Sequence, residues 1–385
     1  MTVSWVDTGV VSGSVDVYEV DARNGFGASA PSLPADVLVF PGLLPVPPGH
    51  SPTPLPPADA FWVTRSGADP TGTTDSGPGI RAALAAAQAQ VGGSHTVYFP
   101  EGIYLVTSFD PNVGPAFYLP VSVAAIVIQG AGRDITRVIG NNSLGKHLCQ
   151  TQVDGCTVND ITFDTALFNG GTALTTNANN TTWNRVGGCT GADFGMRMVG
   201  VEAAHTTGNA IHDLYLDGGA QLEAADMDID YQDGFVGTDW THVGGRIALY
   251  YCGTPGMTGS QGALVDGYTY TASSRAHNQW GLRATRANGV TIQNSPVFRS
   301  GNESAFGKNA SPAIVGDSLT WRNCQSDGSD LPLGDNSGIL IDGCTLATIT
   351  VNPFFFCEGT VVDTIHGAVA YKPQSPSAVI ALTGL

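Results

Sequence analysis

Short stretches of alternating apolar and polar residues recur along most of the chain, and each is followed by a polar corner. Apolar positions within residues 125–128, 211–216 and 339–341 precede corners rich in Gly, Asn and Asp. These corner residues tolerate a positive φ angle, which a tight turn between two strands requires. Units of about 20–30 residues that repeat in this way are typical of stacked arrays. The pattern therefore predicts an all-β fold in which short strands form the coils of a parallel β-helix.

The two ends of the chain depart from this pattern. Residues 1–30 alternate apolar and polar positions and predict a small N-terminal β module. Residues 31–58 hold ten of the 23 prolines, which favours an extended, semi-rigid spacer. The β-helix is expected over residues 59–345. After it the repeat changes, and residues 346–385 are expected to form a C-terminal cap or a contact between chains.

One helix is expected near the start of the β-helix. Its apolar positions are three or four residues apart and predict one buried face, formed by Ile80, Ala83, Leu84, Ala87 and Val91. Asp75 or Ser76 can cap the first turn, and Pro78 suits that turn. The glycine pair at 92–93 ends the helix. Two strands are expected around the Pro-Glu-Gly turn at 100–102.

Three short motifs mark the same region: Gly-Ala-Asp at 67–69, Thr-Thr-Asp at 73–75 and Val-Tyr-Phe-Pro at 97–100. In this order, with the helix between them, they resemble the opening of the pectate-lyase-like superfamily over about residues 59–140. The resemblance implies a right-handed parallel β-helix whose N-terminal end is capped by the short helix. The superfamily includes polysaccharide lyases, polygalacturonase-like hydrolases and bacteriophage tailspikes, so the fold alone does not fix a function.

The composition narrows the protein class. Only 13% of the 385 residues are charged, against about 25% in an average domain. A highly charged disordered chain and a coiled coil both contain more charged residues, so the composition disfavours both. The 50 glycines show no Gly-X-Y period, which excludes collagen. The formal net charge of −17 disfavours a nucleic-acid partner.

The cysteines and the N-terminus bear on where the protein is made. The seven cysteines, an odd number without CxxC spacing, predict buried free thiols rather than disulfides or a zinc site. Three of them lie in a Gly-Cys-Thr tripeptide, at 155–157, 188–190 and 343–345, and are expected inside different coils. No apolar run is long enough to span a membrane, and no export signal opens the chain. We therefore expect assembly in the cytoplasm of the producing cell.

A row of acidic residues is the sharpest candidate for chemistry. On a strand, residues i and i+2 share a face, so Asp226, Asp228 and Asp230 are expected to point outward, with Met227 and Ile229 inward. Neighbouring carboxylates then lie about 6.6 Å apart. This spacing approaches the lower end of the window of about 6.5–9.5 Å for inverting glycoside hydrolysis. One carboxyl protonates the leaving oxygen and the other activates water, which makes the three aspartates catalytic candidates.

Two other interpretations of this row stay open: a solvated acidic surface, or carboxylate ligands of Ca²⁺. Apart from that Ca²⁺, no cofactor is expected. Further residues are candidates for binding the substrate. Arginines can stabilise a uronate or an enolate-like transition state, and aromatic rings can stack on sugars. The candidates are Glu223, Asp233, Asp213, Arg246, Trp280 and Arg283, with further aromatic candidates at Trp240, Tyr250, Tyr251, Tyr268 and Tyr270.

Two functions fit these observations. The first is a bacteriophage tailspike-like or minor tail protein that binds a cell-surface polysaccharide and, if the aspartates act, also cleaves it. The resemblance to tailspikes implies a homotrimer, with contacts expected at 354–356 and 378–382. The N-terminal region would join other tail proteins of the virion. The alternative is a bacterial polysaccharide lyase or glycoside hydrolase. The polygalacturonase-like motifs are absent, and Arg-Ile-Ala at 246–248 is the nearest fragment to their Arg-Ile-Lys.

Overall fold

The chain forms two compact units, Met1–Gly49 and His50–Leu385. In the first unit, β1 (Val15–Tyr18) pairs antiparallel with β4 (Ala35–Leu38), and β2 (Arg23–Asn24) with β3 (Gly27–Ala28). The computed structural model describes these four strands, short segments within 316–382, and residues 56–297 apart from 94, 109–116, 120–123, 141–146, 166–171, 190–193, 218–224, 272–278 and 286.

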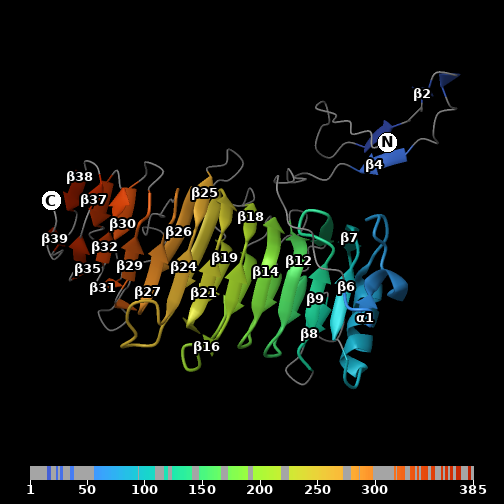
Figure 1. Ribbon diagram of the computed structural model, residues 1–385, viewed down its shortest axis with the longest axis horizontal. Helices are drawn as coiled ribbons and strands as arrows, with labels where there is room; N and C mark the ends of the chain where they lie inside the picture. The colour runs from blue at the N-terminus through green and yellow to red at the C-terminus, as the bar shows by residue number, and fades with distance from the viewer. Residues whose placement is uncertain are drawn as a thin grey trace. The chain divides into compact units, whose positions relative to one another are not determined.

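The second unit is a parallel β-helix, as the sequence and the resemblance predicted (Figure 1). The coils within residues 96–285 contribute strands to three columns, and the strands of a column pair in parallel with those of the coils before and after. The first column consists of β5 (Phe61–Trp62), β6 (Thr96–Phe99), β9 (Val127–Gly130), the first halves of β12 (Thr157–Asp164) and β14 (Thr182–Cys189), β17 (Ala210–His212), β21 (Phe235–Thr238), β24 (Ala263–Asp266), β27 (Val290–Gln293), β29 (Leu319–Arg322), β32 (Leu340–Asp342), β36 (Thr360–Val362) and β39 (Ile380–Leu382).

The second column runs beside the first. It consists of β7 (Gly102–Val106), β10 (Thr136–Gly140), the second halves of β12 and β14, β18 (Tyr215–Asp217), β22 (Thr241–Val243) and β25 (Thr269–Thr271). The third column consists of β8 (Phe117–Leu119), β11 (Cys149–Thr151), β13 (Thr172–Thr176), β15 (Phe194–Val199), β19 (Ala225–Asp230), β23 (Gly245–Tyr250) and β26 (Gln279–Thr285).

Smaller parallel groups complete the coils. One pair joins β16 (Thr206–Thr207) to β20 (Gln232–Asp233). The later groups are β28 (Gly316–Asp317), β31 (Asn336–Ser337) and β35 (Cys357–Glu358); β30 (Asp330–Leu333), β34 (Thr348–Val351) and β38 (Ala370–Pro373); and β33 (Cys344–Thr345) with β37 (Ile365–His366). Parallel pairing thus extends into residues 346–385. The predicted module boundaries at 30, 58 and 345 stay predictions, and the expected chain contact at 354–356 lies outside the described residues.

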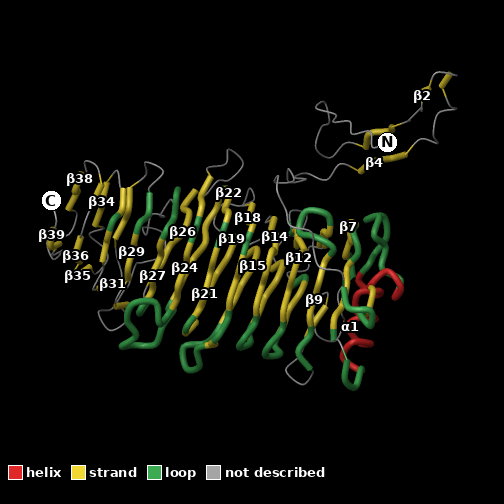
Figure 2. Tube along the Cα trace, in the orientation of Figure 1, coloured by secondary structure: helices red, strands yellow, loops and turns green. Residues whose placement is uncertain are grey.

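The helix α1 (Gly77–Ala89) lies at the start of the stack, as predicted (Figure 2). It packs on β5, β6 and the short helix η1 (Val63–Ser66). The carboxylate of Asp75 accepts the Gly77 N–H at 3.1 Å. Ser76 makes no side-chain cap, so Asp75 satisfies this free donor of the first turn. Ile80, Ala83, Leu84 and Ala87 form the buried face of α1, as predicted. The prediction of Val91 on this face is wrong, because the helix ends at Ala89 and Val91 is fully exposed.

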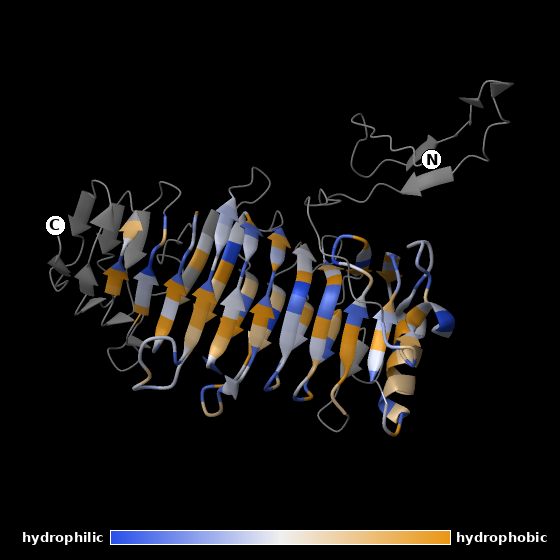
Figure 3. Cartoon of the chain, in the orientation of Figure 1, coloured by the Kyte–Doolittle hydropathy of each residue, from blue (hydrophilic) through white to orange (hydrophobic). Residues whose placement is uncertain are grey.

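The core is a column of apolar side chains in register from coil to coil. Ile128, Val158, Trp183 and Ile211 follow one another along the first column, and all are fully buried. Bands of apolar residues therefore cross successive strands (Figure 3). The five cysteines whose side chains are described are free and buried, as expected; Cys189 and Cys357 have side chains outside the description. In the described part of the chain, no helix is long and apolar enough to cross a membrane.

A left-handed residue turns the chain between the first and second columns in one coil after another. Asp160, Arg185, Asp213 and Asp239 hold this corner with φ angles of 50–56°. Gly267 continues the series in the next coil, and there a side chain would also approach Asp239. The polar corners of the sequence are therefore the points where the strand direction changes.

Trp240 shows how these corners redirect side chains into the core. The residue follows the left-handed Asp239 and is buried. Its indole fills the space beside Gly237, where a Cβ would lie 2.3 Å from the ring. Its Nε1–H donates to the Ile211 carbonyl at 3.1 Å. Trp240, Tyr268 and Tyr270 are therefore core residues, and the sequence-based interpretation of them as exposed sugar-stacking rings is wrong.

Replacing Trp240 with phenylalanine should destabilise the protein by about 1–3 kcal/mol more than the same change at Trp183. Both substitutions remove a similar volume, but only Trp240→Phe leaves a buried carbonyl without its donor. The Trp183 Nε1 has no hydrogen-bond partner among the described residues, so Trp183→Phe is the matched control. Urea unfolding of the two variants measures the difference. Equal losses would show that the indole hydrogen bond contributes nothing.

Candidate functional site

The outer face of the third column carries the acidic row. Along β19, Met227 and Ile229 are fully buried, so Asp228 and Asp230 lie on the opposite face. Parallel register places Asp228 beside Arg197 on β15 and beside Ala248 on β23. Asp228 and Asp230 on β19, Arg197 on β15 and Arg246 on β23 form the group that we call the carboxylate–arginine site.

Arg197 pairs with both carboxylates. Its Nε lies 3.8 Å from Asp228 Oδ2, and its Nη2 lies 3.5 Å from Asp230 Oδ2. Asp228 is only 4% exposed and Arg246 only 3%. The other oxygen of each carboxylate, Oδ1, is buried and accepts no hydrogen bond from any described residue. Asp228 is thus buried and Asp230 partly buried, and each carboxylate has one buried oxygen that no described residue bonds.

Burial and mutual repulsion change the proton affinity of this pair. Burial raises the pKa of Asp228, and the positive charges of Arg197 and Arg246 lower it again in part. Burial and the negative charge of Asp228 raise the pKa of Asp230 to about 7, against the lowering influence of the same two arginines. Close carboxylates in a dry site resist double ionisation. Near neutral pH the pair of carboxylates therefore retains a proton.

The burial and pairing of these carboxylates test the interpretations of the acidic row. A solvated acidic surface is wrong for Asp228, because that side chain is buried and paired with Arg197. The described residues contain no group of three His, Cys, Asp or Glu side chains that could hold a metal ion. The Asp226 side chain lies outside the description, so the Ca²⁺ interpretation stays a prediction. A buried, proton-retaining carboxylate is suited to acid–base chemistry.

The backbone around Asp230 is fixed from inside the coil. Gln232 is fully buried, and its Nε2 donates to the Asp230 carbonyl at 2.9 Å. Its Oε1 accepts Asn209 Nδ2 at 2.8 Å, and Asn209 also donates to the Ala178 carbonyl at 2.9 Å. A satisfied internal amide network of this kind rigidifies the strand end that carries the acid.

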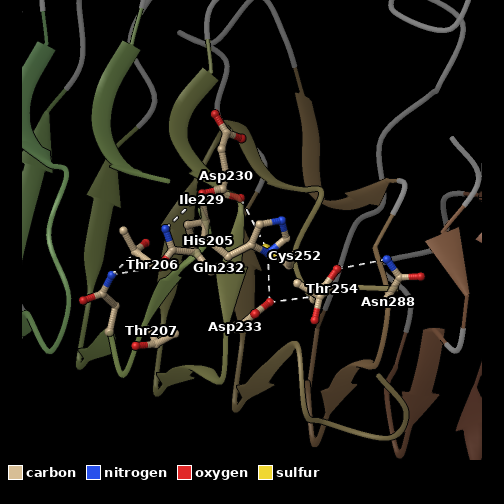
Figure 4. A network of polar contacts seen from close by, with 12 residues as sticks. His205, Thr206, Thr207, Ile229, Asp230, Gln232, Asp233, Cys252, Thr254 and Asn288 are labelled. Carbon is tan, nitrogen blue, oxygen red and sulfur yellow. Dashed lines mark hydrogen bonds and ion pairs between the residues drawn. The ribbon is translucent and has the colours of Figure 1, made fainter. Parts of the chain in front are cut away.

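Beside Asp230 lies a pair that the sequence analysis did not find, His205 with Asp233 (Figure 4). Nδ1 of His205 lies 2.8 Å from Asp233 Oδ1, and the Thr254 N–H donates to the same oxygen at 2.9 Å. Sequence reasoning assigned Asp233 to the substrate and gave His205 no role. His205 lies in a turn without periodicity, so no local pattern indicated it.

The other predicted site residues are dispersed. Asp213 lies at the corner between β17 and β18, where Arg133 Nη1 pairs with it at 2.9 Å, and not on the third column. Arg283 and Trp280 are on β26, where Arg283 is in register with Ala248, but their side chains lie outside the description. Glu223 lies outside the described residues altogether. The structure therefore brings together Asp228, Asp230 and Arg246, and it adds Arg197.

The sequence matches no known protein family and no curated protein. Among solved structures, the chain is similar to the A-module of the Azotobacter vinelandii mannuronan C-5 epimerase AlgE4. The two share 15% identity over 84% of this chain and 100% of that one, with a TM-score of 0.52. The A-module of AlgE6 from the same organism gives 15% identity, coverage of 84% and 99%, and a TM-score of 0.50. These likenesses show a shared fold.

A tailspike protein of Acinetobacter baumannii bacteriophage Fri1, described as a capsular polysaccharide depolymerase, is also similar. The identity is 11%, and the TM-score is 0.46. The alignment covers 85% of this chain and 58% of the tailspike. The chain thus spans little more than half of that protein's length.

Proposed function

We propose that the carboxylate–arginine site binds a polysaccharide and cleaves a glycosidic bond, with Asp230 as the proton donor. The observation that carries this proposal is the state of Asp230: a partly buried carboxyl with a pKa raised to about 7, next to a second carboxyl on the same strand. A general acid works best when its pKa is near the operating pH. Asp230 meets that condition, whereas an ordinary surface aspartate is ionised at neutral pH.

The neighbouring groups have separate roles in this proposal. Asp228 keeps the Asp230 proton in place through its negative charge. Arg197 and Arg246 limit the repulsion between the two carboxylates. Arg197, whose side chain is 28% exposed, can also pair with an anionic group of an acidic polysaccharide. Asp230 then gives its proton to the oxygen between two sugars as that bond breaks. The mannuronan epimerases that share the fold act on a polysaccharide according to their names, which supports the choice of substrate class.

The tail-protein role predicted from the sequence belongs to the same proposal. Its support is the separate compact unit Met1–Gly49 ahead of the β-helix, which suits an attachment module. Under this proposal the polysaccharide lies on the surface of the host cell. The trimer, the virion location and the partner tail proteins stay predictions.

Incubation with purified polysaccharides tests the proposed function. The set contains mannuronan, polygalacturonate and capsular polysaccharides from several bacteria, and the readout is chain length together with new reducing ends. We expect the wild type to shorten at least one of them and Asp230→Asn to do so about 100-fold more slowly or worse. Asp239→Asn makes the same change at an exposed corner aspartate and should retain full activity. If no polysaccharide is shortened, or Asp230→Asn matches the wild type, the proposal is wrong.

A further inference from the structure

His205 is held in one orientation at the corner next to Asp230. Its Nδ1 is 2.8 Å from Asp233 Oδ1, and an ionised carboxylate only accepts hydrogen bonds. In the neutral ring the proton therefore sits on Nδ1, and the lone pair is on Nε2. Asp233 is itself fixed by the Thr254 N–H at 2.9 Å. The arrangement sets both the tautomer and the direction of the imidazole.

The second ring nitrogen is free to act on a ligand. Among the described residues, the hydrogen bond at Nδ1 is the only one that the His205 ring makes. Nε2 is not one of the buried side-chain atoms without a partner in that part of the chain, so it reaches solvent. The side chain as a whole is 9% exposed. His205 thus presents one basic nitrogen to the surface while the rest of the ring is packed.

Backbone contacts place His205 alongside the carboxylate–arginine site. The Gly200 N–H donates to the Asp230 carbonyl at 2.8 Å, and the Thr206 N–H to the Tyr231 carbonyl at 3.0 Å. The turn that carries His205 therefore runs directly beside the end of β19. The imidazole also packs edge-on against the Tyr231 ring, with centroids 5.5 Å apart. Figure 4 shows His205 between Asp230 and Asp233.

We propose that His205 is the proton acceptor of the cleavage reaction, oriented by Asp233; this inference rests on the proposed function. A water molecule attacks the sugar carbon, and its proton passes to His205 Nε2 as the new C–O bond forms. The broken C–O bond leaves its electrons on the glycosidic oxygen, which takes the proton of Asp230. The proton then returns from the imidazolium to the Asp230 carboxylate through solvent, and the net reaction consumes one water.

His205 suits this role better than Asp228 does. Asp228 is 4% exposed and pairs with Arg197, so water reaches it poorly and its charge is partly neutralised. His205 has an accessible lone pair on a fixed ring. Asp233 stabilises the imidazolium that forms, as an orienting carboxylate does beside a catalytic histidine. Proton donor and acceptor then come from two different segments of neighbouring coils.

Chemical rescue tests the inference. On a polysaccharide that the wild type shortens, His205→Ala should lower kcat by about 10²–10⁴-fold with little change in KM. Added imidazole should restore part of the rate, which a purely structural role would not allow. Asp233→Asn should lower kcat less, because the ring remains. His95→Ala, at a histidine bonded to the Ala87 carbonyl near the end of α1, is the control and should behave as the wild type, with or without imidazole.

The outcomes separate this inference from the proposed function. If Asp230→Asn loses turnover while His205→Ala retains it, the role of His205 is wrong and the proposed function stands. A loss in His205→Ala that imidazole does not restore also overturns the role as proton acceptor. If the wild type shortens no polysaccharide, both are wrong. A loss in both variants, with imidazole rescue of His205→Ala alone, is the result expected.

Discussion

Replacing Asp230 with asparagine is expected to stabilise the protein at pH 8 by about 2–4 kcal/mol. In the folded protein this carboxyl keeps its proton up to a pH of about 7, because its pKa is raised from 3.8. In the unfolded chain it loses the proton near the ordinary value. The folded state therefore binds more protons between these two pH values, and the wild type loses stability as the pH rises through this window.

Asparagine has the shape of the aspartate and carries no charge, so the stability of the variant does not fall in this way as the pH rises. The gain should be small at pH 4 and should reach its full size above pH 7. The groups that act on Asp230 are Asp228 on its own strand and Arg197 and Arg246 on the strands to either side. Urea unfolding at pH 4, 6 and 8 measures the gain, with Asp239→Asn as the control that should change little. A destabilised Asp230→Asn variant at pH 8, or a gain independent of pH, would contradict the account.

Replacing Arg246 with methionine is expected to destabilise the protein by about 3 kcal/mol at pH 8. The guanidinium is buried beside two carboxylates whose pKa values it lowers. Methionine retains much of the packing volume but leaves the carboxylates with Arg197 as their counter-charge among the described side chains. The loss should shrink at low pH, where both carboxylates take up protons and need no cation.

A double variant that combines Arg246→Met with Asp228→Asn tests whether the loss of stability comes from charge. If the arginine acts through charge, Arg246→Met should cost much less in that background, because one of the buried negative charges is already removed. Arg322→Met is the comparison, since Arg322 pairs with Asp342 at 3.1 Å and the two side chains are 45% and 33% exposed. Exposed pairs contribute roughly 0–1 kcal/mol. Equal losses for Arg246→Met and Arg322→Met would show that burial adds nothing to the pairing.

The fold could be predicted from the sequence because the patterns that indicate it are local. The corners with Gly, Asn and Asp, the short apolar strands and the helix near residue 80 each depend on neighbours in the chain. Side-chain direction after a corner was harder to predict. A left-handed residue such as Asp239 interrupts the alternation of inward and outward positions, so Trp240 turns into the core although the sequence placed it among the rings that could stack on sugars.

The site could be predicted only in part, because some of its contacts join residues of different coils. Asp228 and Asp230 share one strand, and their common face followed from a spacing of two. Arg197 pairs with them through the register of β15 with β19, which depends on the number of residues in a whole coil. His205 meets Asp233 in the same way from the preceding coil. Residues that come together because coils stack leave no periodic pattern in the sequence. The sequence therefore indicated Asp230 and Arg246 but not Arg197 or His205.

The proposed chemistry requires a protonated Asp230 carboxyl near neutral pH. Carbon-13 NMR of the aspartate side-chain carboxyls, titrated from pH 3 to pH 9 and assigned with Asp230→Asn, observes this proton directly. We expect the Asp230 signal to titrate near pH 7, where its pKa lies, with a second perturbed signal from Asp228 coupled to it. A signal for Asp230 that titrates at the ordinary value of about 3.8 would contradict the account, because the site would then hold no proton to give.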